Sequence, residues 1–225
     1  GSGKTTLMLA SVEAISSAAR TKAIAVDAAT PGISKDVVMD RDHAVKTASG
    51  EQDSQCLFIR SVALHDREII FHDISGVEFE PREDKVLFEE YFNYTDGVVF
   101  MIDPLKMLNS SVSVLPQETF ESFRYMFSQI RGKGPDASYS VPFAVVLSKA
   151  DQGSKIKDSE VREFLVDNGQ QGFVRLVEST FTTVRYFSVS SVGDSYMDAV
   201  RPVWWIVSQA DDEIVKAVDI PIDKE

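Results

Sequence analysis

The sequence predicts one three-layer α/β domain with a mostly parallel sheet and one antiparallel edge strand. Short apolar, strand-like runs alternate with helical patterns along the chain, the order typical of a parallel sheet covered by helices. The runs 97–102 and 143–147 are continuously apolar, as buried parallel strands are. The runs 56–64 and 68–71 are separated by only three residues, which favours an antiparallel hairpin.

Each further element follows from periodicity and from local breakers. We expect helices over 7–17, 85–92, 117–131, 158–166 and 200–208, and further strands over 23–26 and 185–189. The helix over 158–166 has Asp158 or Ser159 near its cap. The polar stretch 28–54 is long for a connection in a compact domain, so it is either functional or partly disordered.

The C-terminal residues are predicted to lie outside the domain. Asp211-Asp212-Glu213 begins an acidic segment that we interpret as a solvated end. The expected division is therefore a domain over 1–210 and an acidic tail over 211–225. The 225 residues are enough for one α/β domain with a full core.

Composition excludes several classes of function. The net charge of −12 disfavours nucleic-acid binding and requires a local positive site for any phosphate ligand. The sequence has no apolar run long enough for a membrane span, and its start does not resemble a signal peptide. A single cysteine, Cys56, predicts a reducing compartment, so we expect a cytoplasmic protein. One Cys and three His make a structural zinc site improbable.

A phosphate-binding motif lies where the first helix begins. Gly3-Lys4-Thr5, followed by Thr6, matches the second half of a Walker A loop. In such a loop, small residues let backbone N–H groups surround the phosphates of a nucleoside triphosphate. Lys4 would extend to the oxygens of the β- and γ-phosphates, and the Thr5 hydroxyl would bind Mg²⁺. The front half of the loop and the strand before it would precede Gly1. The sequence leaves open a piece of a longer protein, an added Gly1-Ser2, or a chance triplet.

A second motif follows the strand-like run 68–71. In Asp73-Ile74-Ser75-Gly76, the carboxylate of Asp73 would hold Mg²⁺ through water, and the Gly76 N–H would contact the γ-phosphate. The alternative is a plain turn at the end of a strand.

Two more motifs follow the strands over 143–147 and 185–189. In Ser148-Lys149-Ala150-Asp151, the Asp151 carboxylate can accept both N1–H and the 2-amino hydrogens of guanine, while the Lys149 stem covers the purine. Ser190 and Ser191 form a small turn whose backbone can approach a base. The alternative is an ordinary solvated strand end. Open α/β sheets bind ligands at the carboxyl ends of their strands, where these motifs are expected.

These motifs, taken in order, resemble the TRAFAC class of P-loop GTPases, which includes the Ras-like G domains. The hairpin before Asp73 is similar to the antiparallel second and third strands of that class. More loosely, the chain resembles a bacterial double-GTPase domain of multi-component bacterial systems in four segments: Phe71–Gly76, Asp96–Phe100, Phe187–Ser190 and the helix over Pro202–Trp205. The resemblance implies GTP or GDP and Mg²⁺ as ligands, hydrolysis of GTP, and a switch that orders 28–54 and 76–85 for a protein effector or activating partner.

The resemblance also assigns roles to single residues, and three positions depart from the family pattern. Nucleotide contacts are expected from Gly3, Lys4, Thr5, Thr6, Gly76, Ser148, Lys149, Asp151, Ser190 and Ser191, metal contacts from Thr5, Thr47 and Asp73, and catalysis from Lys4 and Glu78. Val77 stands where Ras-like enzymes have the water-orienting Gln, and Glu78 follows it. Ser148 replaces the usual Asn or Thr. For the switch threonine Thr47 is preferred and Thr30 is second, and the alternative is that both are ordinary loop threonines.

Two other functions remain open. The missing Gln favours a nucleotide-binding scaffold that mediates assembly without hydrolysis, which a turnover measurement separates from a GTPase. Ala25-Val26-Asp27-Ala28 after the first helix favours a P-loop ATPase of the SIMIBI branch, which competition between ATP and GTP tests.

Three polar or aromatic features are expected to be structural. Asp103 ends the strand over 97–102 and should form a cap or turn. His72 is interpreted as a strand residue, and Trp204 and Trp205 as packing residues of the last helix.

Overall fold

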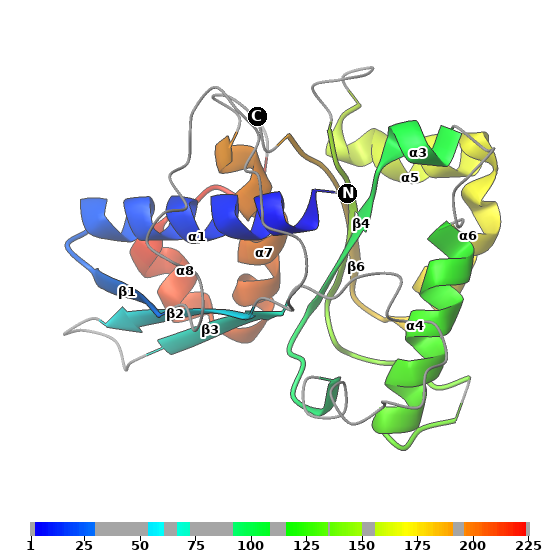
Figure 1. Ribbon diagram of the computed structural model, residues 1–225, viewed down its shortest axis with the longest axis horizontal. Coiled ribbons are helices and arrows are strands. Elements are labelled where there is room, and N and C mark those ends of the chain that lie inside the picture. The colour runs from blue at the N-terminus through cyan, green and yellow to red at the C-terminus, as the bar shows by residue number, and fades with distance from the viewer. Residues whose placement is uncertain are drawn as a thin grey trace. The chain divides into compact units, whose positions relative to one another are not determined.

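The computed structural model describes residues 3–29, 54–60, 67–72, 92–108, 116–134, 136–149, 156–190 and 196–223. The chain divides into two compact units (Figure 1): unit 1 combines Gly3–Asp73 with Val189–Glu225, and unit 2 is Ile74–Ser188. Each unit contains one three-stranded sheet together with helices. The predicted α/β class is therefore confirmed, and the single mostly parallel sheet stays a prediction.

The sheet of unit 1 is antiparallel throughout. Its strands are β1 (Ala25–Ala29), β2 (Ser54–Arg60) and β3 (Arg67–His72), in that order. The predicted hairpin is confirmed by the pairing of β2 with β3. The antiparallel pairing of β1 with β2 was not predicted. It is compatible with the sequence because antiparallel neighbours need no crossover helix, and the segment between these strands has no helical pattern.

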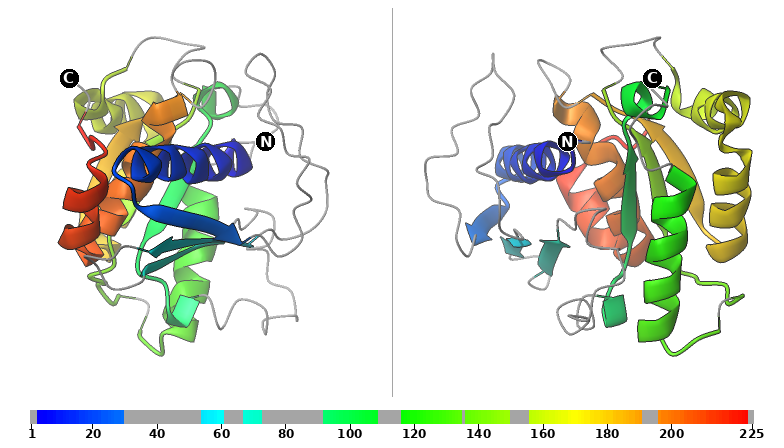
Figure 2. Two further views of the ribbon diagram at one scale, coloured as in Figure 1. Left: turned by 90° about the vertical axis from the view of Figure 1, so that its left-hand side faces the viewer. Right: turned by 45° about the vertical axis from the view of Figure 1, so that its right-hand side comes forward.

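Among the described residues of unit 1 there are three helices: α1 (Lys4–Thr21), α7 (Tyr196–Ala210) and α8 (Asp212–Val218). The sheet lies alongside α1 (Figures 1 and 2). Ala10 and Ala14 of α1 are fully buried, and α1 packs along α7. The Ser11 hydroxyl contacts the Leu7 carbonyl at 2.8 Å and the Ala199 carbonyl of α7 at 3.3 Å. The helix that begins with Lys4 and Thr5 is thus packed against a second helix of the same unit.

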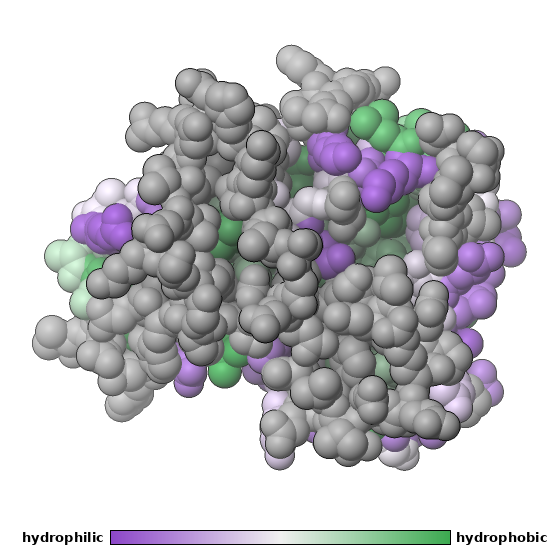
Figure 3. All heavy atoms as spheres, viewed as in Figure 1, coloured by the Kyte–Doolittle hydropathy of each residue, from purple (hydrophilic) through white to green (hydrophobic). Residues whose placement is uncertain are grey.

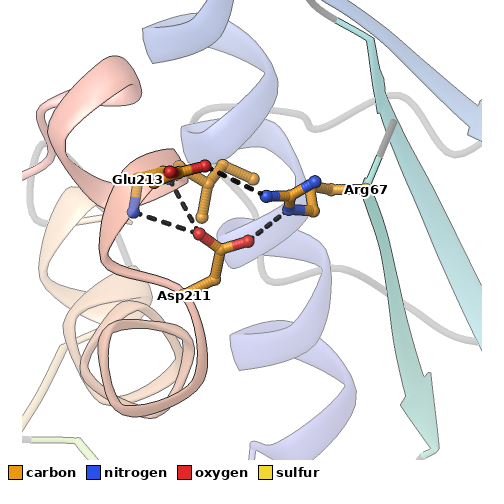
Figure 4. Close-up of polar contacts among 4 residues, drawn as sticks. Arg67, Asp211 and Glu213 are labelled. Carbon is orange, nitrogen blue, oxygen red and sulfur yellow. Dashed lines mark hydrogen bonds and ion pairs between the residues drawn. The ribbon is translucent and has the colours of Figure 1, made fainter. Parts of the chain in front are cut away.

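The acidic C-terminal segment forms part of unit 1 instead of the solvated end that we predicted. Asp211 caps α8, because its carboxylate accepts hydrogen bonds from the backbone N–H groups of Glu213 at 3.0 Å and Ile214 at 3.2 Å. The Arg67 guanidinium of β3 pairs with Asp211 and lies 3.4 Å from Glu213 (Figure 4). Ile214 and Val218 are buried. Apolar residues spaced one helical turn apart thus anchor a segment that the run of acids had suggested was solvated.

We expect Asp211→Ala to lower the free energy of unfolding by about 1–2 kcal/mol, because it removes both a helix cap and a partly buried ion pair. Asp212→Ala is the matched control: the ion pair of Asp212 with Lys216 joins two side chains that are about three-quarters exposed. Such a pair contributes little to stability. Urea unfolding at neutral pH measures both variants, and equal losses would contradict the structural role of Asp211.

The contribution of Asp211 should also depend on pH. Burial alone would raise the pKa of its carboxyl, but the Arg67 guanidinium and the backbone N–H groups outweigh burial and hold the pKa below its ordinary value. A lowered pKa in the folded state stabilises the protein above the unfolded value of about 4, and this contribution is lost as pH falls through the folded value. The difference between Asp211→Ala and the unmodified chain should therefore shrink in acid.

The sheet of unit 2 is parallel. Its strands are β4 (Val98–Ile102), β5 (Phe143–Leu147) and β6 (Val184–Ser188), with β5 in the centre. Ile102, Leu147 and Ser188 are partners in register, so all three strands end at the same level. The parallel strands predicted over 97–102, 143–147 and 185–189 are confirmed. Their common end is the carboxyl edge of the sheet, and we use that term below.

Helices α3 (Pro104–Leu108), α4 (Pro116–Ile130), α5 (Asp158–Leu165) and α6 (Gln171–Thr180) follow these strands. A π-helical turn, Val166–Gln170, joins α5 to α6, and its Gly169 has a φ of +81°. In Figures 1 and 2 these helices lie on one side of the sheet. Helix α5 was predicted; its N-cap is Lys157, and the Glu160 carboxylate accepts from the Lys157 N–H at 2.9 Å.

An aromatic core joins α4 and α6 to the parallel sheet. Phe143 of β5 stacks on Phe181 with ring centroids 4.5 Å apart, and Phe120 of α4 meets Phe143 edge to face at 5.5 Å. Burial of such rings contributes both area and specific geometry. The other aromatic members of this core are Phe92, Phe123, Phe127, Tyr139 and Phe173. This packing fixes β5, and therefore the point where the chain leaves the sheet at Ser148.

Candidate functional site

One candidate segment is the start of α1 in unit 1. Gly3 precedes the helix with φ 84° and ψ 16°, a left-handed conformation that glycine adopts without steric cost. The Leu7 N–H donates to the Gly3 carbonyl at 2.9 Å, which closes the first turn of the helix. Lys4, Thr5 and Thr6 form that turn and are half-buried, and it contains no acidic residue.

This turn suits an anion. The first N–H groups of a helix have no intrahelical acceptor, and the helix dipole places partial positive charge there. Lys4 adds a full positive charge in a chain whose net charge is −12. The start of α1 therefore has the backbone and the charge that a phosphate group needs.

Another candidate segment, described here by itself, is the carboxyl edge of the sheet in unit 2. Ser148 directly follows β5 and is buried. Its backbone N–H donates to the Ile102 carbonyl at 2.9 Å, and its hydroxyl donates to the same oxygen at 3.2 Å. Ser148 thereby joins the end of β5 to the end of β4.

Lys149 is held at this edge by a carboxylate from the neighbouring strand. Its Nζ lies 2.7 Å from Oδ2 of Asp103, whose side chain is 2% exposed, whereas that of Lys149 is 33% exposed. The other oxygen of Asp103, Oδ1, accepts from the backbone N–H groups of Leu105 at 3.1 Å and Lys106 at 3.4 Å. The prediction that Asp103 forms a cap or turn is therefore confirmed.

The ion pair between Asp103 and Lys149 was missed by the sequence analysis. Part of the signal was present, because Asp103 comes directly after the last residue of one predicted parallel strand and Lys149 comes two residues after the last residue of the other. The pairing of Ile102 with Leu147 brings both segments to the same edge of the sheet, but it places Asp103 level with Ser148, and Lys149 lies one residue further along. Lys149 also has a positive φ of 57°, which is uncommon for a residue other than glycine and marks a sharp change of chain direction after β5.

The end of β6 is fixed in a similar way. The backbone N–H of Ser188 donates to Oδ1 of Asp158, at the start of α5, at 2.9 Å. Ser190 follows two residues later and is buried; with Val189 it is assigned to unit 1.

The remaining predicted site residues lie outside the described residues: Thr47, Asp73, Gly76, Glu78, Asp151 and Ser191, together with Thr30 and Val77. The structure brings Gly3, Lys4, Thr5 and Thr6 together at one helix start, and Ser148 and Lys149 at one sheet edge. Within the described ranges no cluster of three His, Cys, Asp or Glu side chains could hold a metal ion. Mg²⁺ at a phosphate site takes few protein ligands besides phosphate oxygens, so a hydroxyl at Thr5 fits that ion.

The surface beside the carboxyl edge is mixed in character. Leu105, Lys106 and Leu108 of α3 are exposed, and the space-filling view shows hydrophobic and hydrophilic atoms next to one another over this helix (Figure 3).

In the part of the chain that is described, no helix combines the length and apolar character needed to cross a bilayer. No protein-family model matches the sequence, and searches of curated proteins and of solved structures found no similar chain.

Proposed function

We propose that this chain is a guanine-nucleotide-binding P-loop GTPase domain that hydrolyses GTP to GDP and phosphate with Mg²⁺ and acts as a molecular switch. One observation supports the proposal: two of the motif segments lie at the kinds of position that nucleotide-binding α/β proteins use, a helix start and the carboxyl end of a parallel strand. Gly3 is left-handed before a helix that opens with Lys4, and Lys149 leaves the carboxyl end of a buried parallel strand. The proposal includes the three-layer P-loop fold with a mostly parallel sheet and one antiparallel edge strand.

The phosphates are assigned to the start of α1. Backbone N–H groups of the first turn would bind phosphate oxygens, and the Lys4 ammonium would neutralise charge at the β and γ positions. The Thr5 hydroxyl, with Asp73 and Thr47, would hold Mg²⁺. When bound, that ion neutralises charge that develops on the phosphate oxygens during transfer.

The base is assigned to the segment after β5. The Asp151 carboxylate would accept the N1–H and 2-amino hydrogens of guanine, a pair of donors that adenine lacks. The aliphatic stem of Lys149 would cover one face of the purine. Ser148 supports this segment through its two contacts with the Ile102 carbonyl. Ser190 and Ser191 would approach the base edge with their backbone.

We expect slow hydrolysis by the chain alone, below about 1 s⁻¹, because positioning and charge neutralisation lower only part of the barrier to phosphoryl transfer. Val77 cannot orient a water molecule, and the Glu78 carboxylate is repelled by the γ-phosphate. An activating partner that inserts an arginine would raise the rate by roughly 10³–10⁵. Single-turnover hydrolysis of GTP with Mg²⁺ measures the rate.

The same measurement separates the proposal from its main alternative. GTP binding without any turnover, with or without cell extract as a source of activator, would favour a non-hydrolysing scaffold. Turnover at tens per second without a partner would show that the catalytic group is misassigned. Val77→Gln supplies the missing amide and should raise the rate, whereas the volume-matched Val77→Thr should not.

A further inference from the structure

We propose that Asp103 is a positioning residue for Lys149 and, through it, a determinant of affinity for the purine base. This inference rests on the proposed function. It concerns a residue at the end of β4, a different strand from the one that leads into the guanine motif. The inference is based on the 2.7 Å contact between Oδ2 of Asp103 and Nζ of Lys149.

The Asp103 carboxylate is fixed before any ligand binds. Its side chain is 2% exposed, and Oδ1 is held by the backbone N–H groups of Leu105 and Lys106 at the start of α3. A carboxylate buried to this extent needs a charged or hydrogen-bonding partner, because its desolvation is otherwise uncompensated. Lys149 supplies that partner on Oδ2.

This contact constrains a side chain that is otherwise flexible. A lysine side chain has about 2 kcal/mol of rotamer entropy, part of which is lost when its stem must cover a ligand. With Nζ anchored on Asp103 and the backbone turned at φ 57°, both ends of the stem are fixed. Binding then costs less ordering, which is the usual origin of affinity gained by preorganisation. A third of the Lys149 side chain remains exposed despite this contact.

A purely structural role for Asp103 would act through α3 alone. The two roles use different oxygens, so they can be separated by one substitution. Asp103→Asn keeps an oxygen that accepts from Leu105 and Lys106 but removes the negative charge that holds Lys149. Lys149→Gln removes the other charge and leaves the cap of α3 in place.

Four proteins are compared: the unmodified chain, the two single variants and the double variant. For each one, the affinity for fluorescently labelled GDP with Mg²⁺ and the midpoint of urea unfolding are measured. We expect Asp103→Asn to weaken GDP binding by about tenfold with a nearly unchanged midpoint. In the Lys149→Gln background, Asp103→Asn should change the affinity by less than about twofold, because residues that act through one contact are not additive. Glu178→Gln is the control: it breaks the ion pair with Arg162 between α5 and α6 and should leave GDP affinity unchanged.

Two results would overturn the inference while the proposed function stands: unchanged GDP affinity in Asp103→Asn, or additive losses in the double variant. If Asp103→Asn fails to fold, Lys149→Gln decides by itself, and an unchanged affinity would overturn the inference. Absence of GDP binding by the unmodified, folded chain would instead overturn the proposed function, and the inference with it.

Discussion

Lys4→Ala should reduce the affinity for Mg·GTP by roughly 30- to 1000-fold, the equivalent of about 2–4 kcal/mol. Lys4 is the charged residue in the first turn of α1, and that turn contains no acid that would compete with a phosphate. The loss should leave folding almost unaffected, because Lys4 is half-buried and is not one of the buried residues of the core. Isothermal titration with Mg·GTP gives the affinity, and thermal unfolding without nucleotide gives the stability.

Arg20→Ala is the matched control for this prediction. Arg20 lies in the last turn of the same helix and is exposed, so its removal changes the net charge equally at the opposite end. Its effect on GTP binding should be small. If Lys4→Ala binds Mg·GTP as well as the unmodified chain, the phosphates are not bound at the start of α1.

Asp151→Asn should weaken GTP binding by about 2–4 kcal/mol and shift the preference toward xanthosine triphosphate. The carboxylate accepts two hydrogens from guanine, whereas an amide can donate to the 2-oxo group of xanthine. This exchange of partners predicts a reversal of selectivity and not merely a loss of affinity. Competition between GTP and xanthosine triphosphate for the same labelled nucleotide measures the ratio directly.

Asp167→Asn provides the control for Asp151→Asn. Asp167 is an exposed residue of the π-helical turn in the same unit, and its substitution removes the same charge. It should alter neither affinity nor base preference. A parallel loss of GTP and xanthosine triphosphate binding in Asp151→Asn would indicate that Asp151 supports the fold and does not read the base.

The parts of the fold that local patterns determine could be predicted from the sequence. Continuous apolar runs identified β4 and β5, and the three-residue gap identified the hairpin of β2 and β3. The glycine–lysine turn identified the start of α1, where Gly3 adopts the left-handed conformation. Each of these elements is determined by a few consecutive residues, so hydrophobic periodicity or backbone sterics is enough to predict it.

The parts that depend on contacts between distant segments could not be predicted in the same way. In the sequence Asp211 is one of several consecutive acidic residues. Its structural role depends on an ion pair with Arg67, which lies far away in the sequence. The pairing of β1 with β2 joins strands separated by a long polar stretch. Asp103 and Lys149 illustrate the boundary: parallel neighbouring strands bring both residues to one sheet edge, but their ion pair also depends on the positive φ of Lys149, which the sequence does not predict.

The central claim is that this chain binds guanine nucleotides, and competition between GTP and ATP tests it most directly. The unmodified chain is equilibrated with labelled GDP and Mg²⁺, and unlabelled GTP or ATP is titrated against it. Two charge-assisted hydrogen bonds to guanine that adenine cannot make predict that ATP competes at least about 30-fold more weakly than GTP. Equal displacement by ATP and GTP would contradict the guanine assignment.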